Sequence, residues 1–211
     1  MVESNYYVKY QKYKNKYLNL HKEYQLKLSG GSVPTPVDKI KTIVLMRHGE
    51  KPEPHSHGQL NCQGFNRAIR LGPLLLKRFG IPDEIYAPKP TLTFDNQWYI
   101  RPIITIEPYA ILANKQVNVK YDFLEQNRKE LAKELFDAPA GTYVISWEHH
   151  LAIDLLSEIH IIFGHKFERF VWPDDDYDRL YILTYNYTTN VLSMKQDKQG
   201  LDNMSTECRL T

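Results

Sequence analysis

The feature that most constrains the fold of this chain is a short apolar run that ends in an arginine, a histidine and a glycine. Residues 42–46 carry no charge and include two β-branched aliphatics, which is typical of a buried strand. Arg47 and His48 follow directly, and Gly49 lets the backbone turn away without the steric cost of a Cβ. Ligands in α/β domains bind at the carboxyl ends of such strands. We therefore expect Arg47 and His48 to lie at the edge of the sheet where the chemistry takes place.

A second strong strand is predicted at residues 142–147, and it has a similar ending. It delivers Glu148, His149 and His150 to the sheet edge, and the apolar run at 151–163 is predicted to follow as a helix. The two histidine-containing segments therefore occupy equivalent ends of two strands.

Further motifs follow the first in a fixed order along the chain. They are, with the first included, Arg47-His48-Gly49-Glu50, residues 60–68 (LNCQGFNRA), residues 85–88 (IYAP), Arg101-Pro102, residues 105–108 (TIEP), residues 143–149 (YVISWEH) and residues 172–183 (WPDDDYDRLYIL). This order resembles the histidine phosphatase superfamily, which includes cofactor-dependent phosphoglycerate mutases. The resemblance covers roughly residues 39–187.

The hydrophobic pattern of the remaining sequence predicts helices that alternate with strands. Helices are predicted at 61–79, 99–113 and 124–136, and weaker strands at 84–87, 117–121 and 179–187, the last paired with 191–194. The first helix is expected to begin after Asn61 and to cover the sheet with one apolar face, formed by Phe65, Ala68, Ile69, Gly72, Leu75, Leu76 and Phe79. Such alternation predicts a three-layer α/β/α sandwich with a mostly parallel sheet. The resemblance implies that this sandwich is phosphoglycerate mutase-like.

Length and charge divide the chain into a body and an appendage. At 211 residues it is long enough for one core. Residues 1–28 hold six lysines against two glutamates, so this segment carries +4 and leaves −2 for the rest of a chain whose net charge is +2. We predict a basic Tyr/Lys-rich helical arm at 1–28, a linker at 29–38 and a catalytic domain at 39–211. A nearly neutral body argues against nucleic-acid binding. Since no apolar run resembles a signal peptide or a membrane span, we expect an intracellular, cytoplasmic protein without a membrane partner.

The arm has aromatic residues at helical spacing, and three interpretations of it stay open. Its seam can pack on the catalytic domain or on a second copy of the chain, its lysines can bind an acidic partner, or it can order only when a partner is met. The seam consists of Tyr6, Tyr10, Tyr13, Tyr17, Leu20 and Tyr24. The Lys-Tyr pattern resembles the starts of proteins from giant DNA viruses, which would place the protein in the host cytoplasm or the virion.

Neither a disulfide framework nor a metal site is predicted. Cys62 and Cys208 are two isolated cysteines, which we interpret as free thiols. His55 and His57 lie on a polar loop at 51–58, but no carboxylate or cysteine has a customary companion spacing. We therefore expect no metal and no cofactor.

The chemistry that fits these residues is phosphoryl transfer. It requires a nucleophile and fixed positive charge around the phosphoryl oxygens. A neutral imidazole is a competent nucleophile near pH 7, so His48 is the predicted nucleophile, and Arg47 supplies a planar, permanently charged fork. The resemblance implies that Arg101 is a second phosphate clamp and that His149 donates to a phosphoryl oxygen. The alternatives are a surface ion pair for each arginine and a core histidine satisfied by backbone.

The proton donor to the leaving group is not apparent from the sequence. Asp122, Glu125 and Glu148 are candidates, and the absence of any donor is a fourth alternative. We predict a phosphomonoester hydrolase that acts through a phosphohistidine on a phosphorylated small molecule or phosphopeptide. A phosphoglycerate-type mutase shares the first half-reaction, and a catalytically degenerate phosphate-recognising or scaffold protein is the third reading.

Overall fold

The computed structural model of the chain describes residues 39–53, 57–93 and 96–208. The predicted arm and linker, with His55, lie outside the described residues. The elements are β1 (Ile40–Arg47), α2 (Cys62–Phe79), β2 (Glu84–Tyr86), β3 (Thr91–Leu92), β4 (Trp98–Tyr99), α3 (Arg101–Ala113), β5 (Val117–Asn118), α4 (Glu125–Asp137), β6 (Gly141–Trp147), α5 (His149–Ile162), β7 (Arg179–Asn186) and β8 (Val191–Lys198). None of the helices within these ranges combines the length and the apolarity needed to cross a bilayer.

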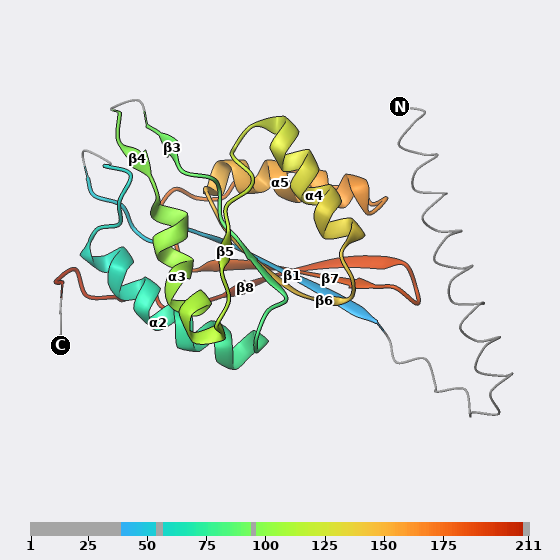
Figure 1. The fold of residues 1–211 in the computed structure, drawn as a ribbon, viewed down its shortest axis with the longest axis horizontal. Coiled ribbons are helices and arrows are strands. Elements are labelled where there is room, and N and C mark those ends of the chain that lie inside the picture. Colours follow the sequence, from blue (N-terminus) through green and yellow to red (C-terminus); the bar gives the residue numbers. More distant parts are fainter. Residues whose placement is uncertain (1–38, 54–56, 94–95, 209–211) are drawn as a thin grey trace, which may run out of the picture.

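A mixed sheet forms the centre of the fold. In the described part of the chain its six strands have the order β5-β2-β6-β1-β7-β8. The pairs β5–β2, β2–β6 and β6–β1 are parallel, whereas β7 and β8 close the sheet in antiparallel fashion. Helices α2 and α3 lie on one side of the sheet and α4 and α5 on the other (Figure 1). The three-layer, mostly parallel α/β architecture expected from the sequence is confirmed.

Strand β1 has core on both faces, which explains why its residues 43–46 are continuously apolar. Ile43 and Leu45 pack with α4 and α5, whereas Val44 and Met46 pack with α2 and α3. All four side chains are buried. Because helices cover β1 on both faces, the residues that directly follow this strand are enclosed as well. His48 is accordingly buried.

Helix α2 begins where the sequence indicated, and Ala68, Gly72 and Leu75 of the predicted apolar face are buried. Asn61 caps it by accepting a hydrogen bond from the Gly64 amide. Phe65 and Ile69, expected inside, are 37% and 49% exposed, whereas Arg67 is buried. The reason is a close approach of backbones: a Cβ on Gly64 would lie 2.4 Å from the Glu50 carbonyl oxygen. Gly64 and Arg67 therefore turn toward Glu50, whereas Phe65 and Ile69 turn outward.

The C-terminal segment continues the fold beyond the predicted strand at 191–194. Strand β8 continues to Lys198, and residues 199–208 run back along α2, where the Asn66 amide donates to the carbonyls of Ser205 and Glu207. A disulfide joins Cys62 to Cys208, so the expectation of two free thiols is wrong. The two cysteines are 146 positions apart, and only the folded topology brings them together.

Candidate active site

The site arises because β1 and β6 are parallel neighbours in register. Arg47 pairs with Trp147 at the last position of both strands, so the residues that follow each strand meet at the same edge. The His48 amide donates to the Trp147 carbonyl at 3.0 Å, which extends the pairing by one residue. His48 and the Glu148-His149 pair are thereby placed side by side.

His48 is oriented through its backbone neighbour. Its Nδ1 lies 2.7 Å from the Gly49 carbonyl oxygen, an acceptor, so Nδ1 carries the proton and Nε2 keeps its lone pair. The Gly49 amide in turn donates to Thr105 Oγ1 at 2.8 Å, which ties the loop to α3. Burial, together with the charges of Arg101 and Arg47, lowers the pKa of His48 to about 3. The imidazole is therefore neutral at any ordinary working pH.

Two buried arginines flank this histidine, each against a tyrosine ring. The guanidinium carbon of Arg47 lies 3.8 Å from the Tyr177 ring centre, and that of Arg101 lies 4.3 Å from the Tyr99 ring centre. Both tyrosines also contact His48, with ring centres 5.9 Å (Tyr99) and 6.3 Å (Tyr177) away. Arg47 and Arg101 are only 1% and 6% exposed, so their charge acts in a medium of low polarity.

The Arg47 guanidinium group uses only some of its hydrogen-bond donors within the described part of the chain. Its Nη1 donates to the Asp174 carbonyl at 2.5 Å and, more weakly, to that of Pro173 at 3.4 Å. Its Nε is buried and has no acceptor among the residues that the structure describes. A buried donor without an acceptor is costly. An anion bound at this edge would relieve that cost.

His149 is the first residue of α5 and lies between two carboxylates. Glu148 caps the helix by accepting from the Leu151 amide at 2.9 Å, and its Oε1 lies 2.6 Å from His149 Nδ1. Burial alone raises the pKa of Glu148, but the contact with His149 and the amide of Leu151 outweigh it and lower the pKa to about 2. Glu148 is thus an anion in contact with the His149 ring.

Asp174 is the site residue that sequence reasoning missed. Its Oδ1 lies 2.7 Å from His149 Nε2 and 3.3 Å from the Nε2 atom of the exposed His150. The side chain is 82% exposed, and the contact with His149 lowers its pKa. The Asp-rich run at 174–176 was visible in the sequence, yet nothing there showed that this loop folds back over β1 and β6.

The candidate acids Asp122 and Glu125 are engaged elsewhere. Asp122 accepts a hydrogen bond from the Leu124 amide at 2.8 Å, at the start of α4. Glu125 forms an exposed ion pair with Lys129. Phe123, between them in sequence, does reach the site wall, because its ring packs on Tyr99 with centres 5.5 Å apart. The chain segment is therefore near the site, while both carboxylates are held by partners in or beside α4.

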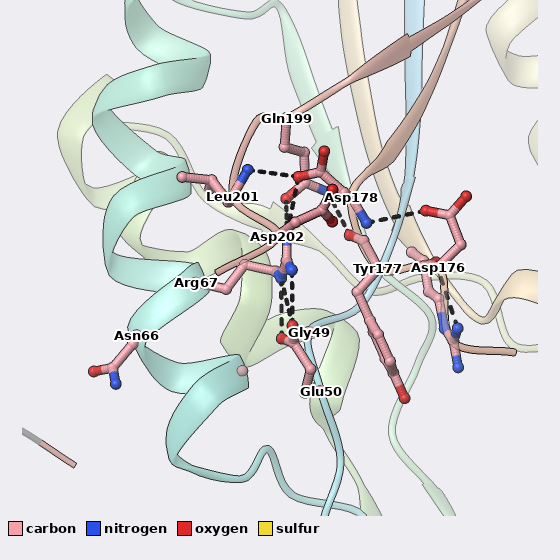
Figure 2. A network of polar contacts seen from close by, with 12 residues as sticks. Gly49, Glu50, Asn66, Arg67, Asp176, Tyr177, Asp178, Gln199, Leu201 and Asp202 are labelled. Carbon is pink, nitrogen blue, oxygen red and sulfur yellow. Dashed lines mark hydrogen bonds and ion pairs between the residues drawn. The ribbon is translucent and has the colours of Figure 1, made fainter. Parts of the chain in front are cut away.

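A buried polar network supports the loop that carries His48. Figure 2 shows Arg67 reaching from α2 toward Glu50 on one side and Asp178 on the other. Arg67 grips Glu50 with Nη2 at 2.7 Å and Nε at 2.9 Å, and its Nη1 contacts Asp178 at 3.3 Å. Gln199 joins by accepting from Nη1 and by donating to the Tyr177 carbonyl (Figure 2). The network holds Glu50, three residues after Arg47, and Tyr177, whose ring packs against the Arg47 guanidinium group.

One group of residues in the described ranges has the spacing of metal ligands. Glu148, His149 and His150 each offer a ligand atom, all within 4.8 Å of one another. Glu148 already caps α5 and His149 already contacts Asp174, so a cation would have to displace these contacts. The nearby charge of Arg47 opposes a cation as well.

The chain is thus an α/β protein with two histidines and two arginines buried at the carboxyl edge of its sheet. No protein-family model matches the sequence, and no curated protein matches it.

Several solved structures with a similar fold are phosphatases. Protein histidine phosphatase SixA complexed with tungstate has 14% identity and a TM-score of 0.47 over 75% of this chain and 97% of that one. A mycobacterial glucosyl-3-phosphoglycerate phosphatase with inorganic phosphate has 14% identity and a TM-score of 0.48 over 74% and 95%. A phosphoserine phosphatase mutant from Entamoeba histolytica has 13% identity and a TM-score of 0.44 over 76% and 98%. None of these comparisons bears on the Lys-Tyr pattern of residues 1–28.

Proposed function

We propose that the protein is a phosphomonoester hydrolase that works through a phosphohistidine on His48. The observation that carries this proposal is a buried, neutral imidazole with its lone pair on Nε2, flanked by two buried guanidinium groups. A neutral nucleophile beside fixed positive charge suits attack on a phosphoryl group, because that group brings negative charge of its own. The same arrangement would repel a cationic substrate.

The first step forms a bond between His48 Nε2 and phosphorus while the bond from phosphorus to the leaving oxygen breaks. The electron pair of that bond stays with the leaving oxygen, which takes a proton or departs as an anion. Arg47, Arg101 and His149 stabilise the negative charge on the remaining phosphoryl oxygens. His149 would donate from Nε2, the atom that now faces Asp174.

The second step returns the enzyme to its starting state. A water oxygen attacks phosphorus, the electron pair of the broken bond returns to Nε2, and the water gives its proton to the group that protonated the leaving oxygen or to solvent as inorganic phosphate forms. His48 regains a neutral ring because its proton stays on Nδ1, which donates it in a hydrogen bond to the Gly49 carbonyl throughout. If a second substrate hydroxyl takes the place of water, the reaction becomes a mutase, which a coupled mutase assay would detect.

The decisive experiment is trapping of the phosphoenzyme with ³²P-labelled substrates, from a panel of phosphorylated metabolites and phosphopeptides, followed by quenching that preserves phosphohistidine. We expect label on His48, and we expect His48→Ala to lower turnover by about 10⁴-fold or more. His165→Ala, at the other end of α5, is the matched control and should label normally. Label absent with every donor would favour a phosphate-recognising or scaffold protein instead.

The proton donor can be found with a series of leaving groups of increasing pKa. General acid catalysis contributes about 10²–10⁴-fold, so an enzyme without a donor should prefer aryl phosphates, acyl phosphates or phosphohistidine to alkyl esters. Asp122→Asn and Glu125→Gln should change little, because both side chains have other partners. Asp174→Asn and Glu148→Gln complete the set. A shallow dependence that one substitution makes steep would identify the donor and exclude acid-free catalysis.

We also propose that catalysis needs no metal ion, since two arginines and His149 supply the positive field. Activity should survive extended treatment with a chelator. Activity that is lost on chelation and restored by a divalent ion would overturn this part of the proposal and would return attention to Glu148, His149 and His150 as ligands.

A further inference from the structure

An open pocket of about 710 Å³ lies apart from His48, between α4 and the sheet edge formed by β5, β2 and β6. Tyrosines from the sheet side line it, namely Tyr86, Tyr121 and Tyr143. The hydroxyl groups of Tyr86 and Tyr121 both donate to Glu134 on α4, which fixes the rings in place. None of the residues that line the pocket belongs to the site around His48.

The pocket carries an excess of negative charge. Five carboxylates line it against two lysines, Lys120 and Lys133. Both lysines are already paired, with Glu134 and Asp137 respectively. The carboxylates of Asp83, Glu84 and Glu130 remain in excess, and Glu84 and Glu130 are exposed. The pocket therefore favours a basic ligand with aromatic groups that can pack on tyrosine rings.

The chain enters the described structure beside this pocket. The carbonyl of Lys39 accepts from the Tyr187 amide, and the Tyr187 hydroxyl donates to the carbonyl of Ala138, which lines the pocket. Two residues further along, Lys41 Nζ donates to the carbonyls of Leu135 and Phe136 at the end of α4. Whatever precedes Lys39 is therefore tethered close to the pocket rim.

We propose that this pocket binds the chain's own basic, tyrosine-rich segment, residues 1–28. That segment carries six lysines against two glutamates, which complements the excess carboxylates of the pocket. The ten residues 29–38 separate it from Lys39 and can span up to about 33 Å. This length is sufficient, because Tyr187 connects Lys39 to Ala138 at the pocket rim. Tethering raises the local concentration of the segment, so weak contacts suffice.

Zero-length cross-linking of the full-length protein with a carbodiimide tests the proposal, because this reagent joins a lysine to a carboxylate only when the two are in contact. We expect links in the monomer from lysines of residues 1–28 to Glu84 and Glu130, identified by mass spectrometry. High salt should suppress them, since the Debye length falls to about 3 Å at 1 M.

Variants with matched controls make the result specific. The double substitution Glu84→Gln and Glu130→Gln should lower the yield of all links from residues 1–28 by about fivefold, as expected for loss of exposed ion pairs. Glu107→Gln on α3 and Glu168→Gln after α5 remove equally exposed carboxylates outside the pocket and should leave the yield unchanged. Unchanged circular dichroism will show that the variants are folded.

Two outcomes would overturn the proposal. Links spread evenly over surface carboxylates, Glu107 and Glu168 included, would mean that the segment has no preferred site. Links to the pocket that occur only in covalent dimers would mean that a second copy supplies the segment. Because none of these measurements uses turnover, their result is independent of the phosphatase proposal.

Discussion

At the scale of single residues, the neutral state of the His48 imidazole follows from its burial. An exposed histidine would titrate near pH 6.5. At that pH half of the molecules would carry a protonated imidazole, which has no lone pair for nucleophilic attack. Here the enclosing protein and the charges of Arg101 and Arg47 hold the ring neutral. The bond from Nδ1 to the Gly49 carbonyl then decides which nitrogen keeps the lone pair.

We predict that His48 stays neutral, with its proton on Nδ1, from pH 8 down to about pH 4. Nitrogen-15 NMR of the imidazole rings measures this directly, with the exposed His57 as an internal reference in the same spectra. Because the unfolded chain protonates His48 near pH 6.5 and the folded state only near 3, this residue makes the folded state less stable as the pH falls through that window. A titration of His48 with a midpoint above pH 6 would contradict the prediction.

In the proposed mechanism, Asp174 holds the position that a phosphoryl oxygen of the substrate would take. Its carboxylate faces His149 Nε2 in the absence of ligand, while its backbone carbonyl holds Arg47 Nη1. The carboxylate is mostly exposed, so the contact is screened by water and can be exchanged at little cost. An incoming phosphoryl oxygen would replace it.

We predict that Asp174→Ala raises the affinity for vanadate or tungstate by roughly threefold to tenfold, because a competing anion is removed while the backbone contact to Arg47 remains. Isothermal titration calorimetry measures the affinity. The neighbouring Asp175→Ala should have little effect, since Asp175 is exposed. Weaker oxyanion binding in Asp174→Ala would show that the residue organises the site and does not compete for it.

At the scale of secondary-structure elements, α2 holds the His48 loop through one buried side chain. Arg67 is 1% exposed and is the cation between the buried carboxylates of Glu50 and Asp178. Asp178 also accepts from the amides of Gly200 and Leu201, which brings in the segment after β8. Removal of the cation would leave two buried negative charges facing each other.

We predict that Arg67→Met lowers the free energy of unfolding by about 3–5 kcal/mol, the range for breaking a buried ion pair from one side. Arg70→Met on the exposed face of the same helix is the control and should stay within about 0.5 kcal/mol of the wild type. Denaturant titration followed by circular dichroism gives both values. Equal stabilities for the two variants would mean that the network is not needed for the fold.

At the scale of the whole molecule, the Cys62–Cys208 disulfide closes nearly all of the described chain into a loop. It joins the first residue of α2, close to Glu50, to the end of the described C-terminal segment. Disulfides are rare in reducing compartments. The redox state of Cys62 and Cys208 should therefore be measured in the protein as it is isolated from cells.

We predict that the oxidised protein is more stable than Cys208→Ser by about 2–4 kcal/mol, because the cross-link restricts the unfolded chain. Denaturant titration with and without a reducing agent tests this, and the reducing agent should have no effect on Cys208→Ser. Alkylation followed by mass spectrometry will show the thiol state. If both cysteines alkylate without prior reduction, the original expectation of free thiols is restored.

Much of the architecture was determined by the sequence itself, because local patterns carry it. The continuous apolar run before Arg47 specified a doubly buried strand, Asn61 specified the start of α2, and the alternation of helices and strands specified the layers. The convergence of His48 and His149 was predictable too, since parallel strands end at one edge of a sheet. These features depend on residues close together in the chain and on general rules of packing.

The tertiary structure alone decided the contacts between segments distant in sequence. The burial of Arg67 depends on how closely Gly64 lets α2 approach Glu50, and the place of Asp174 depends on the path of a loop more than 100 residues after β1. The partner of Cys62, which lies 146 positions away, has the same origin. Each is fixed by backbone distances in three dimensions, which periodicity along a chain does not encode.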